Sequence, residues 1–320
     1  MSFNQEKLRE IAFEFFYVLT ERNAQQSLSS GTGTAMWIAI YLIDAGQVLS
    51  AIALPRYGWS PSILIYLNKF DIFQLIFSFL PQSDNMARSL FVTAAVVVML
   101  TILVTVVVVR TLQMENVSKE WPVAVLRRMD VLLVSTIYTS TLAWLLLPLQ
   151  CNDDSYDTTD TISSWIRGED APCTPFGPLE AGVTVTSLVL ALIFTVASTA
   201  TSLFNFEPNV LSQAPAVRFT GRVEALWCVV RTLAVIIRFA EARILQLTCL
   251  VATCIAASVA LAFHISILPF HSQVFNLLRG AILGAVVWFA IASAVVCSVS
   301  GDPTGPSPTM QMSMSIMGLV

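Results

Sequence analysis

Six nearly uncharged apolar segments, each about 20 residues long, constrain the fold of this chain more than any other feature. A helix needs roughly 20 apolar residues to cross a hydrocarbon layer of about 30 Å, so each segment predicts a membrane-spanning helix. Backbone polar groups cannot stay unpaired in lipid, and we therefore expect an all-α, polytopic bundle. The predicted spans cover residues 34–54, 89–109, 131–149, 181–204, 244–265 and 277–298.

The composition supports a membrane protein and excludes two other classes. Charged residues make up 12% of the 320 residues, and hydrophobic residues make up 56%. A pair of soluble domains of this length would need far more polar surface. The net charge is −4, and no basic surface suited to phosphates is evident, so nucleic acid is not an expected partner. The expected environment is the lipid bilayer.

Two charged apolar segments in the first quarter of the chain predict helices at the membrane surface. The first covers 7–22, within an N-terminal region 1–33, and sets apolar positions against acidic ones. The second covers 61–80 and holds Lys69 and Asp71 near its middle. Each charge would cost about 2.5–3.5 kcal/mol at the bilayer centre, so an interfacial helix is the cheaper interpretation.

The connector between the fourth and fifth spans, residues 205–243, is rich in arginine. The run 223–265 contains no Gly or Pro, and as one helix it would be about 64 Å long, twice the bilayer thickness. We expect its first half to lie in the membrane plane as a cationic helix. The basic residues expected to contact anionic lipid there are Arg218, Arg222, Arg231, Arg238 and Arg243.

The distribution of Lys and Arg predicts the orientation. In a six-span arrangement, twelve of the 17 basic residues fall on the side of the N-terminus, the connector and the tail 299–320. The positive-inside rule then places both termini in the cytoplasm, in the plasma membrane or another membrane of the secretory pathway. The sequon at Asn116 would lie on the cytoplasmic side and is predicted to be unglycosylated. An alternative with 61–80 as a seventh crossing would place the termini on opposite sides.

The loop 150–180 is expected to face the exterior or a lumen. It carries seven acidic residues against the single base Arg167, and Cys151 and Cys173 bracket it. An oxidising compartment would join these two cysteines in a disulfide, which for a loop of this length adds roughly 3 kcal/mol. The alternative is two free thiols. The remaining cysteines fall in apolar segments and are expected to be packing residues.

Asp44 and Gln47, inside the first span, form the most specific candidate site. A carboxylate there must face the bundle, be paired or be protonated, and Gln47 shares its helix face. The functional interpretation is an ion, proton or substrate pathway. The alternative is a structural hydrogen bond between helices, worth about 1 kcal/mol.

Motifs for catalysis are scarce, and we expect a protein that is not an enzyme and needs no cofactor. HExxH, CxxC, GxSxG and phosphate-binding glycine loops do not occur. His264 and His271 are weak candidates for a metal site. Gly280 and Gly284 permit close helix contact, which would allow a homo- or hetero-oligomer to form through the spans.

Residues 204–224 carry a resemblance to a known family. They read Phe-Asn-Phe-Glu-Pro-Asn-Val-Leu-Ser-Gln-Ala-Pro-Ala-Val-Arg-Phe-Thr-Gly-Arg-Val-Glu. This connector resembles that of the TmcB-like polytopic membrane proteins of algae, ciliates and other protists. There a turn after a span leads to a small-Pro-x-x-Arg motif, a Gly-Arg-hydrophobic-Glu motif and a basic apolar helix. The resemblance implies the N-terminal membrane sector of a larger protein that continues into cytoplasmic PAS-type sensor repeats.

Three functions remain open from these features. The first is a non-enzymatic sensing or signalling module that couples the external acidic loop to the cytoplasmic basic helices. The second is an ion channel or transporter that uses Asp44 and Gln47. The third is a receptor-like protein, which needs seven spans.

Overall fold

The computed structural model describes most of the apolar part of the chain as α-helices. The described residues are 31–53, 59, 66, 69, 86–113, 134, 136–149, 178–204, 220–240, 243–270 and 272–299. The helices are α2 (Gly31–Ile52), α5 (Met86–Gln113), α7 (Tyr138–Leu146) with a 3-10 turn (Leu147–Leu149), α9 (Pro178–Phe204), α10 (Arg222–Phe239), α11 (Arg243–Ile267) and α12 (Gln273–Val299).

Among the described residues, five helices are long and apolar enough to cross a membrane, which confirms a multi-pass helical membrane protein. Their apolar parts are Thr34–Ile52, Ser89–Val107, Gly182–Leu203, Ile244–Ile267 and Gln273–Ser298. These match five of the six predicted spans.

The third predicted span, 131–149, differs from the expectation. Its described part is the shorter apolar helix Tyr138–Leu149. Pro148 lacks an amide donor and crowds the preceding turn, so the helix tightens into its 3-10 end at Leu147–Leu149. A count of six long spans is therefore not confirmed.

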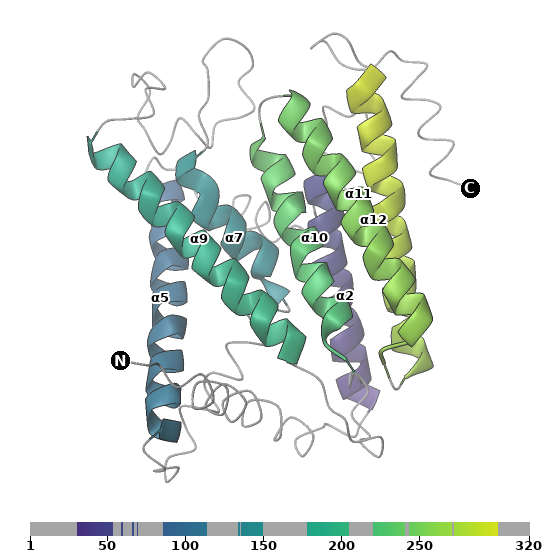
Figure 1. Cartoon of the computed structure of the whole chain (residues 1–320), viewed down its shortest axis with the longest axis horizontal. Helices are drawn as coiled ribbons and strands as arrows, with labels where there is room; N and C mark the ends of the chain where they lie inside the picture. Colours follow the sequence, from purple (N-terminus) through teal and green to yellow (C-terminus); the bar gives the residue numbers. More distant parts are fainter. Residues whose placement is uncertain are drawn as a thin grey trace, which may run out of the picture.

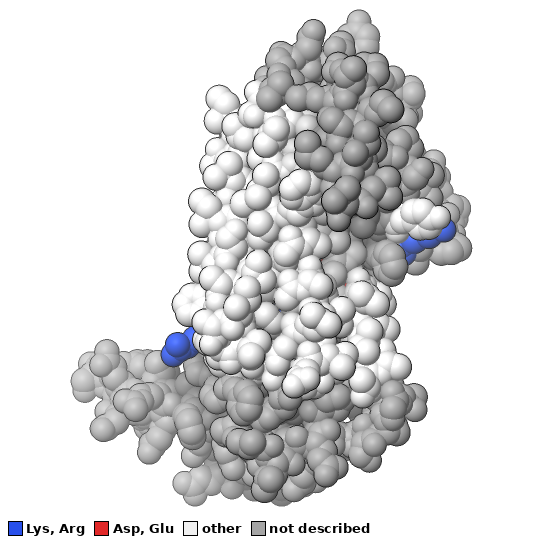
Figure 2. All heavy atoms as spheres, turned by 90° about the vertical axis from the view of Figure 1, so that its right-hand side faces the viewer, with Lys and Arg blue, Asp and Glu red and all other residues white. Residues whose placement is uncertain are grey.

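The surface of the helices suits lipid. Figure 2 shows that the described residues on one face are almost wholly uncharged. On α5 the exposed side chains include Val92, Val96, Met99 and Leu103. Such a row of apolar side chains is stable in a bilayer and not in water.

The helices form two groups, each with its own apolar core. One group is α2, α10, α11 and α12, and the other is α5, α7 and α9; they lie on opposite sides of Figure 1. The first core includes Val48, Val230, Leu250 and Leu283. The helix α10 borders both groups, because Val235 and Phe239 pack into the second core.

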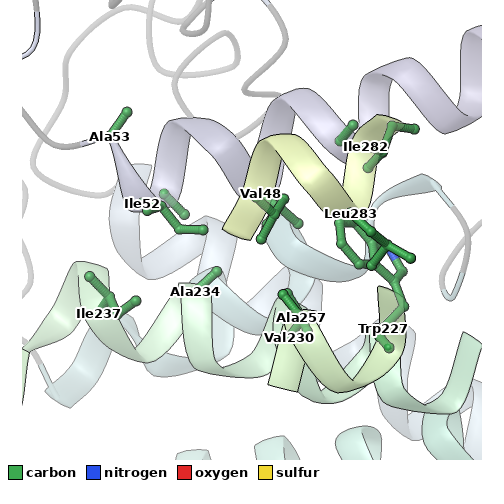
Figure 3. Packing of buried hydrophobic residues seen from close by; sticks show 14 of the residues in the cluster. Val48, Ile52, Ala53, Trp227, Val230, Ala234, Ile237, Ala257, Ile282 and Leu283 are labelled. Carbon is green, nitrogen blue, oxygen red and sulfur yellow. The ribbon is translucent and has the colours of Figure 1, made fainter. Parts of the chain in front are cut away.

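The helix α10 corrects the expectation of a cationic helix in the membrane plane. It lies inside the bundle, beside α2, α9 and α11, and Arg231 is buried. Figure 3 shows Val230 and Ala234 of α10 in the same apolar cluster as Val48 of α2. The bundle accepts an arginine here because it supplies the opposite charge, as described below.

The long apolar run 223–265 is two helices instead of one. Ala240 leaves the helical conformation with a ψ of 113°, and the side-chain amide of Gln246 donates to its carbonyl at 2.6 Å. The chain then reverses into α11, which packs along α10. The helix ends at Ala240 although neither Gly nor Pro marks the turn.

The first and last helices run in the same direction. Tyr41 contacts Phe275 near the start of α12, and Ser293 donates to the carbonyl of Ile52 near its end, at 3.4 Å. Gly31 and Val299 therefore lie at opposite ends of the bundle (Figure 1). The six-span arrangement has these helices antiparallel, so this part of the prediction is wrong.

Several predicted features lie outside the described residues. They are the amphipathic helix 7–22, most of 61–80, the loop 150–177 with Cys151 and Cys173, the connector 205–219 with Arg218, and the tail 300–320. The disulfide and the side of the membrane on which each terminus lies stay predictions.

Candidate functional site

Four charged side chains are buried together where α2, α10 and α12 meet. Asp44 is 4% exposed, Glu224 6%, Arg231 2% and Arg279 1%. We call these four residues the charge network. Its two carboxylates and two guanidinium groups sum to zero formal charge, as expected for charges held away from water.

Asp44 is held by two residues of α10. The Arg231 guanidinium donates through Nη1 to Oδ1 of Asp44 at 3.2 Å, and the Trp227 indole donates to Oδ2 at 2.6 Å. Positions 227 and 231 are four apart on a helix, so both side chains lie on the face toward α2. Asp44 therefore faces the bundle and is paired.

Arg279 connects α12 to the same place. Its Nη2 donates to Oε2 of Glu224 at 2.6 Å, and its Nη1 lies 4.0 Å from Oδ2 of Asp44. The guanidinium also lies against two aromatic rings, 4.3 Å from the Trp227 centroid and 5.2 Å from the Tyr41 centroid. Cation–π contacts of desolvated arginines are worth up to about 2 kcal/mol.

Arg231 also reaches toward the second helix group. It donates to the backbone carbonyl of Val134, donates through Nη2 to the Cys228 sulfur at 2.9 Å, and lies 4.5 Å over the Tyr138 ring. Gln47 makes a parallel contact, because its amide donates to the carbonyl of Thr136 at 3.0 Å. Asp44 and Gln47 thus share a helix face, but each bonds a different neighbour.

Polar contacts mark the border between the two helix groups. The Tyr138 hydroxyl lies 2.8 Å from that of Thr232 and donates to that of Thr195 at 3.3 Å. Ser202 of α9 lies 3.2 Å from the sulfur of Cys228. Each group has an apolar core, whereas α10 meets α7 and α9 partly through hydroxyl, thiol and guanidinium groups.

Both arginines keep open donors. Among the described residues, Nε of Arg231 and both Nε and Nη1 of Arg279 find no acceptor. Leaving a buried donor unpaired costs about 1–3 kcal/mol, and more for a charged group. Three buried nitrogen atoms of the charge network therefore have no acceptor among the described residues.

The histidine pair is only half described. His264 is buried near the last turn of α11, and its Nε2 lies 2.8 Å from the carbonyl of Asn276. His271 lies outside the described residues. Within the described ranges, no three His, Cys, Asp or Glu side chains are placed to hold a metal ion.

The arginines of the predicted lipid-binding connector separate into different environments. Arg231 is buried in the charge network, so the expectation that it contacts lipid is wrong. Arg222 is exposed at the start of α10, and Arg238 donates to Ser50 at 3.4 Å. The side chains of Arg218 and Arg243 are outside the described residues.

The four described cysteines are not joined in disulfides. Cys228, Cys249 and Cys297 are buried, and Cys254 is partly exposed. Three of them therefore lie in the apolar interior, as expected for packing residues. Cys228 differs, because it contacts Arg231.

Sequence reasoning missed three of the four members of the charge network. It identified Asp44, but it assigned Arg231 to the membrane surface and gave Glu224 and Arg279 no role in a site. One signal was available: each acid and base falls in an otherwise apolar segment, and such charges pair with one another in membrane proteins.

In comparisons with known proteins, no protein-family model, curated protein or solved structure matches the chain. The fold and the site thus define a class only: a multi-pass helical membrane protein with a buried, charge-balanced network.

Proposed function

We propose that the protein is a membrane transporter that moves a charged solute together with protons, with the charge network at its centre. The observation that carries this proposal is the burial of Asp44, Arg231, Glu224 and Arg279 between α2, α10 and α12 in an otherwise apolar helix bundle. Ionisable residues inside membrane helices are costly and mark ion, proton or substrate pathways.

The energetics favour function over stability as the reason for these charges. Desolvating an ion pair costs several kcal/mol per ion, and well-packed apolar residues of similar size are often as stable or more so. The open donors of Arg231 and Arg279 add to that cost. A purely structural role would be served at least as well by apolar side chains.

The two helix groups suit a transport cycle. Transporters expose a central site to each side in turn by moving one helix bundle against another. Here the charge network lies where α10 borders both groups, and the border contains exchangeable polar contacts such as Tyr138 with Thr232. Hydrogen bonds of this kind can re-form in a second arrangement.

The same geometry supports seven membrane crossings. These are the five long apolar helices together with α7 and α10. α10 has 18 residues and is about 27 Å long, close to the hydrocarbon thickness. Its four charged residues make α10 less apolar than the five long helices. Two of these charges, on Glu224 and Arg231, are neutralised by partners inside the bundle. In this arrangement α10 crosses the membrane parallel to α2.

The other functions have less support. The sensing hypothesis depends on the loop 150–177 and the connector 205–219, which lie outside the described residues. Membership of the TmcB-like proteins depends on that connector as well and stays a proposal. The receptor-like hypothesis takes 61–80 as its seventh crossing, a segment mostly outside the described residues, and it offers no role for the charge network.

Reconstitution into liposomes tests the proposed function. Purified protein is placed in vesicles that enclose a pH-sensitive dye, with potassium and valinomycin to hold the membrane potential, in a buffer containing several small anions. After an imposed pH step, vesicles with protein should change their internal pH faster than protein-free vesicles. Equal rates would contradict the proposal.

A further inference from the structure

We infer that Arg279 binds a small monoanion, and that the anion enters the charge network together with one proton carried by Asp44. This inference rests on the proposed transport function and names its substrate class. The shared chemistry is a compact acceptor with one negative charge, as in nitrate, chloride or a small carboxylate.

The first reason is the set of open donors. Arg279 is 1% exposed, and it uses only Nη2 in a hydrogen bond, to Glu224. Its Nε and Nη1 find no acceptor among the described residues, although Nη1 lies 4.0 Å from Asp44. The Nε of Arg231 is open as well. Buried guanidinium groups bind oxyanions and halides with charge-assisted hydrogen bonds.

The second reason is the charge balance. The network is neutral as it stands, so a bound monoanion would leave one uncompensated negative charge in an apolar interior. One proton taken up by a carboxylate restores neutrality. The anion and the proton therefore enter as a neutral pair, and no co-reactant is needed.

Asp44 is the better proton carrier of the two acids. Glu224 bonds Arg279 at 2.6 Å, whereas Asp44 lies 3.2 Å from Arg231 and 4.0 Å from Arg279. Protonation of Asp44 weakens its attraction to both guanidinium groups and leaves them for the anion. The other titratable or charged side chains around this region are Tyr41, Tyr138, Glu224, Cys228, Arg231, His264 and Arg279.

The surroundings of Arg279 limit the size of the anion. The Tyr41 and Trp227 rings lie against the guanidinium, and both belong to the apolar core. A bulky organic anion would have to displace these rings. Nitrate is thus a suitable probe, and gluconate is a suitable anion for comparison.

The flux test uses vesicles of the full chain with nitrate or gluconate outside and the membrane potential held at zero. Inward nitrate should acidify the lumen, with about one proton for each nitrate, and gluconate should not. The Asp44→Asn variant should admit nitrate without acidification. Proton flux that is equal in nitrate and gluconate would overturn the anion inference while the transport proposal stands. Absence of flux in both would instead overturn the transport proposal.

A binding test separates the two proposals further. The thermal unfolding temperature in detergent is measured in sodium nitrate and in sodium gluconate at equal ionic strength. Nitrate should raise the Tm of the wild type relative to gluconate, and more so at lower pH, because binding to the folded state stabilises it. An unchanged wild-type Tm would overturn the inference even if transport occurs.

Two variants locate the site. Glu224→Gln/Arg279→Gln removes one charge of each sign, and Arg279→Lys keeps the charge but loses the guanidinium donors; both should lose the response to nitrate. Arg238→Gln, on α10 but outside the charge network, should keep it. A nitrate response that persists in both Arg279 variants would place the anion elsewhere and overturn the inference.

Discussion

Arg231 and Asp44, 187 positions apart in the chain, form a buried ion pair with 3.2 Å between Nη1 and Oδ1. This pair joins α10 to α2 and explains how an arginine-bearing helix lies inside a membrane bundle. Each residue alone would be an unpaired charge in an apolar interior, and together they are neutral. Together with the apolar contacts of α10, this pair holds the helix beside α2.

A double-mutant cycle should detect the coupling between these two residues. Asp44→Asn leaves Arg231 buried without its main partner, and Arg231→Gln leaves Asp44 in the same state, so each should cost about 3–5 kcal/mol. The double variant Asp44→Asn/Arg231→Gln should cost less than the sum. Reversible unfolding in mixed micelles measures the free energies.

The matched control for this cycle is Arg238→Gln combined with Asp44→Asn. Arg238 bonds Ser50 instead of the charge network, so its effect should add to that of Asp44→Asn within about 0.5 kcal/mol. Additivity in the Asp44 and Arg231 cycle as well would show that the pair is not coupled.

Gly221 should tolerate no side chain, because α9 ends against the start of α10 at this point. A Cβ at Gly221 would overlap the backbone carbonyl oxygens of Ser202 and Leu203, which cannot rotate away. Gly221→Ala should cost at least about 3 kcal/mol and lower the yield of folded protein. Gly284→Ala is the control: its Cβ meets no atom within 4 Å, and it should be neutral or slightly stabilising. Equal yields of the two variants would contradict this packing.

Tyr138→Phe should slow transport more than it lowers stability. The change removes one hydroxyl that contacts Thr232 of α10 across the helix-group border and Thr195 of α9 within its own group, worth about 1 kcal/mol. Thr93→Val removes a hydroxyl from the exposed face of α5 and should leave the rate unchanged. Proton flux in vesicles and the Tm measure the two effects. A Tyr138→Phe rate equal to that of Thr93→Val would argue against movement at this border.

Membrane-impermeant thiol labelling should place the two ends of α10 on opposite sides. Thr220→Cys precedes α10 and Ala242→Cys follows it. If α10 crosses the membrane, an impermeant maleimide added to sealed vesicles should label only one of the two variants, with the unsubstituted protein as the background. Labelling of both from the same side would contradict a crossing by α10.

Much of the fold could be predicted from length and hydropathy. Five predicted spans agree with long apolar helices within a few residues, because a membrane leaves the backbone few alternatives to a helix. The position of α10 could not be predicted in this way. Its four charges argue for the surface when the helix is considered alone, and only the partners on α2 and α12 reverse that conclusion.

The candidate site, like the fold, could be predicted only in part. Asp44 is identifiable because a single acid in an apolar span is costly wherever it points. Its partners Arg231, Trp227 and Arg279 are not, because they lie far along the chain and their approach depends on how three helices pack. Hydropathy reports the depth of a segment but not its neighbours.

The central claim is that Asp44 in the buried charge network carries the transported proton. The most direct test is the rate of internal pH change in vesicles that contain equal amounts of wild type, Asp44→Asn or Arg238→Gln, after the same pH step and with the potential held at zero. The account predicts that Asp44→Asn falls to the rate of protein-free vesicles while Arg238→Gln stays near the wild type. An Asp44→Asn variant that inserts normally and moves protons at the wild-type rate would contradict it.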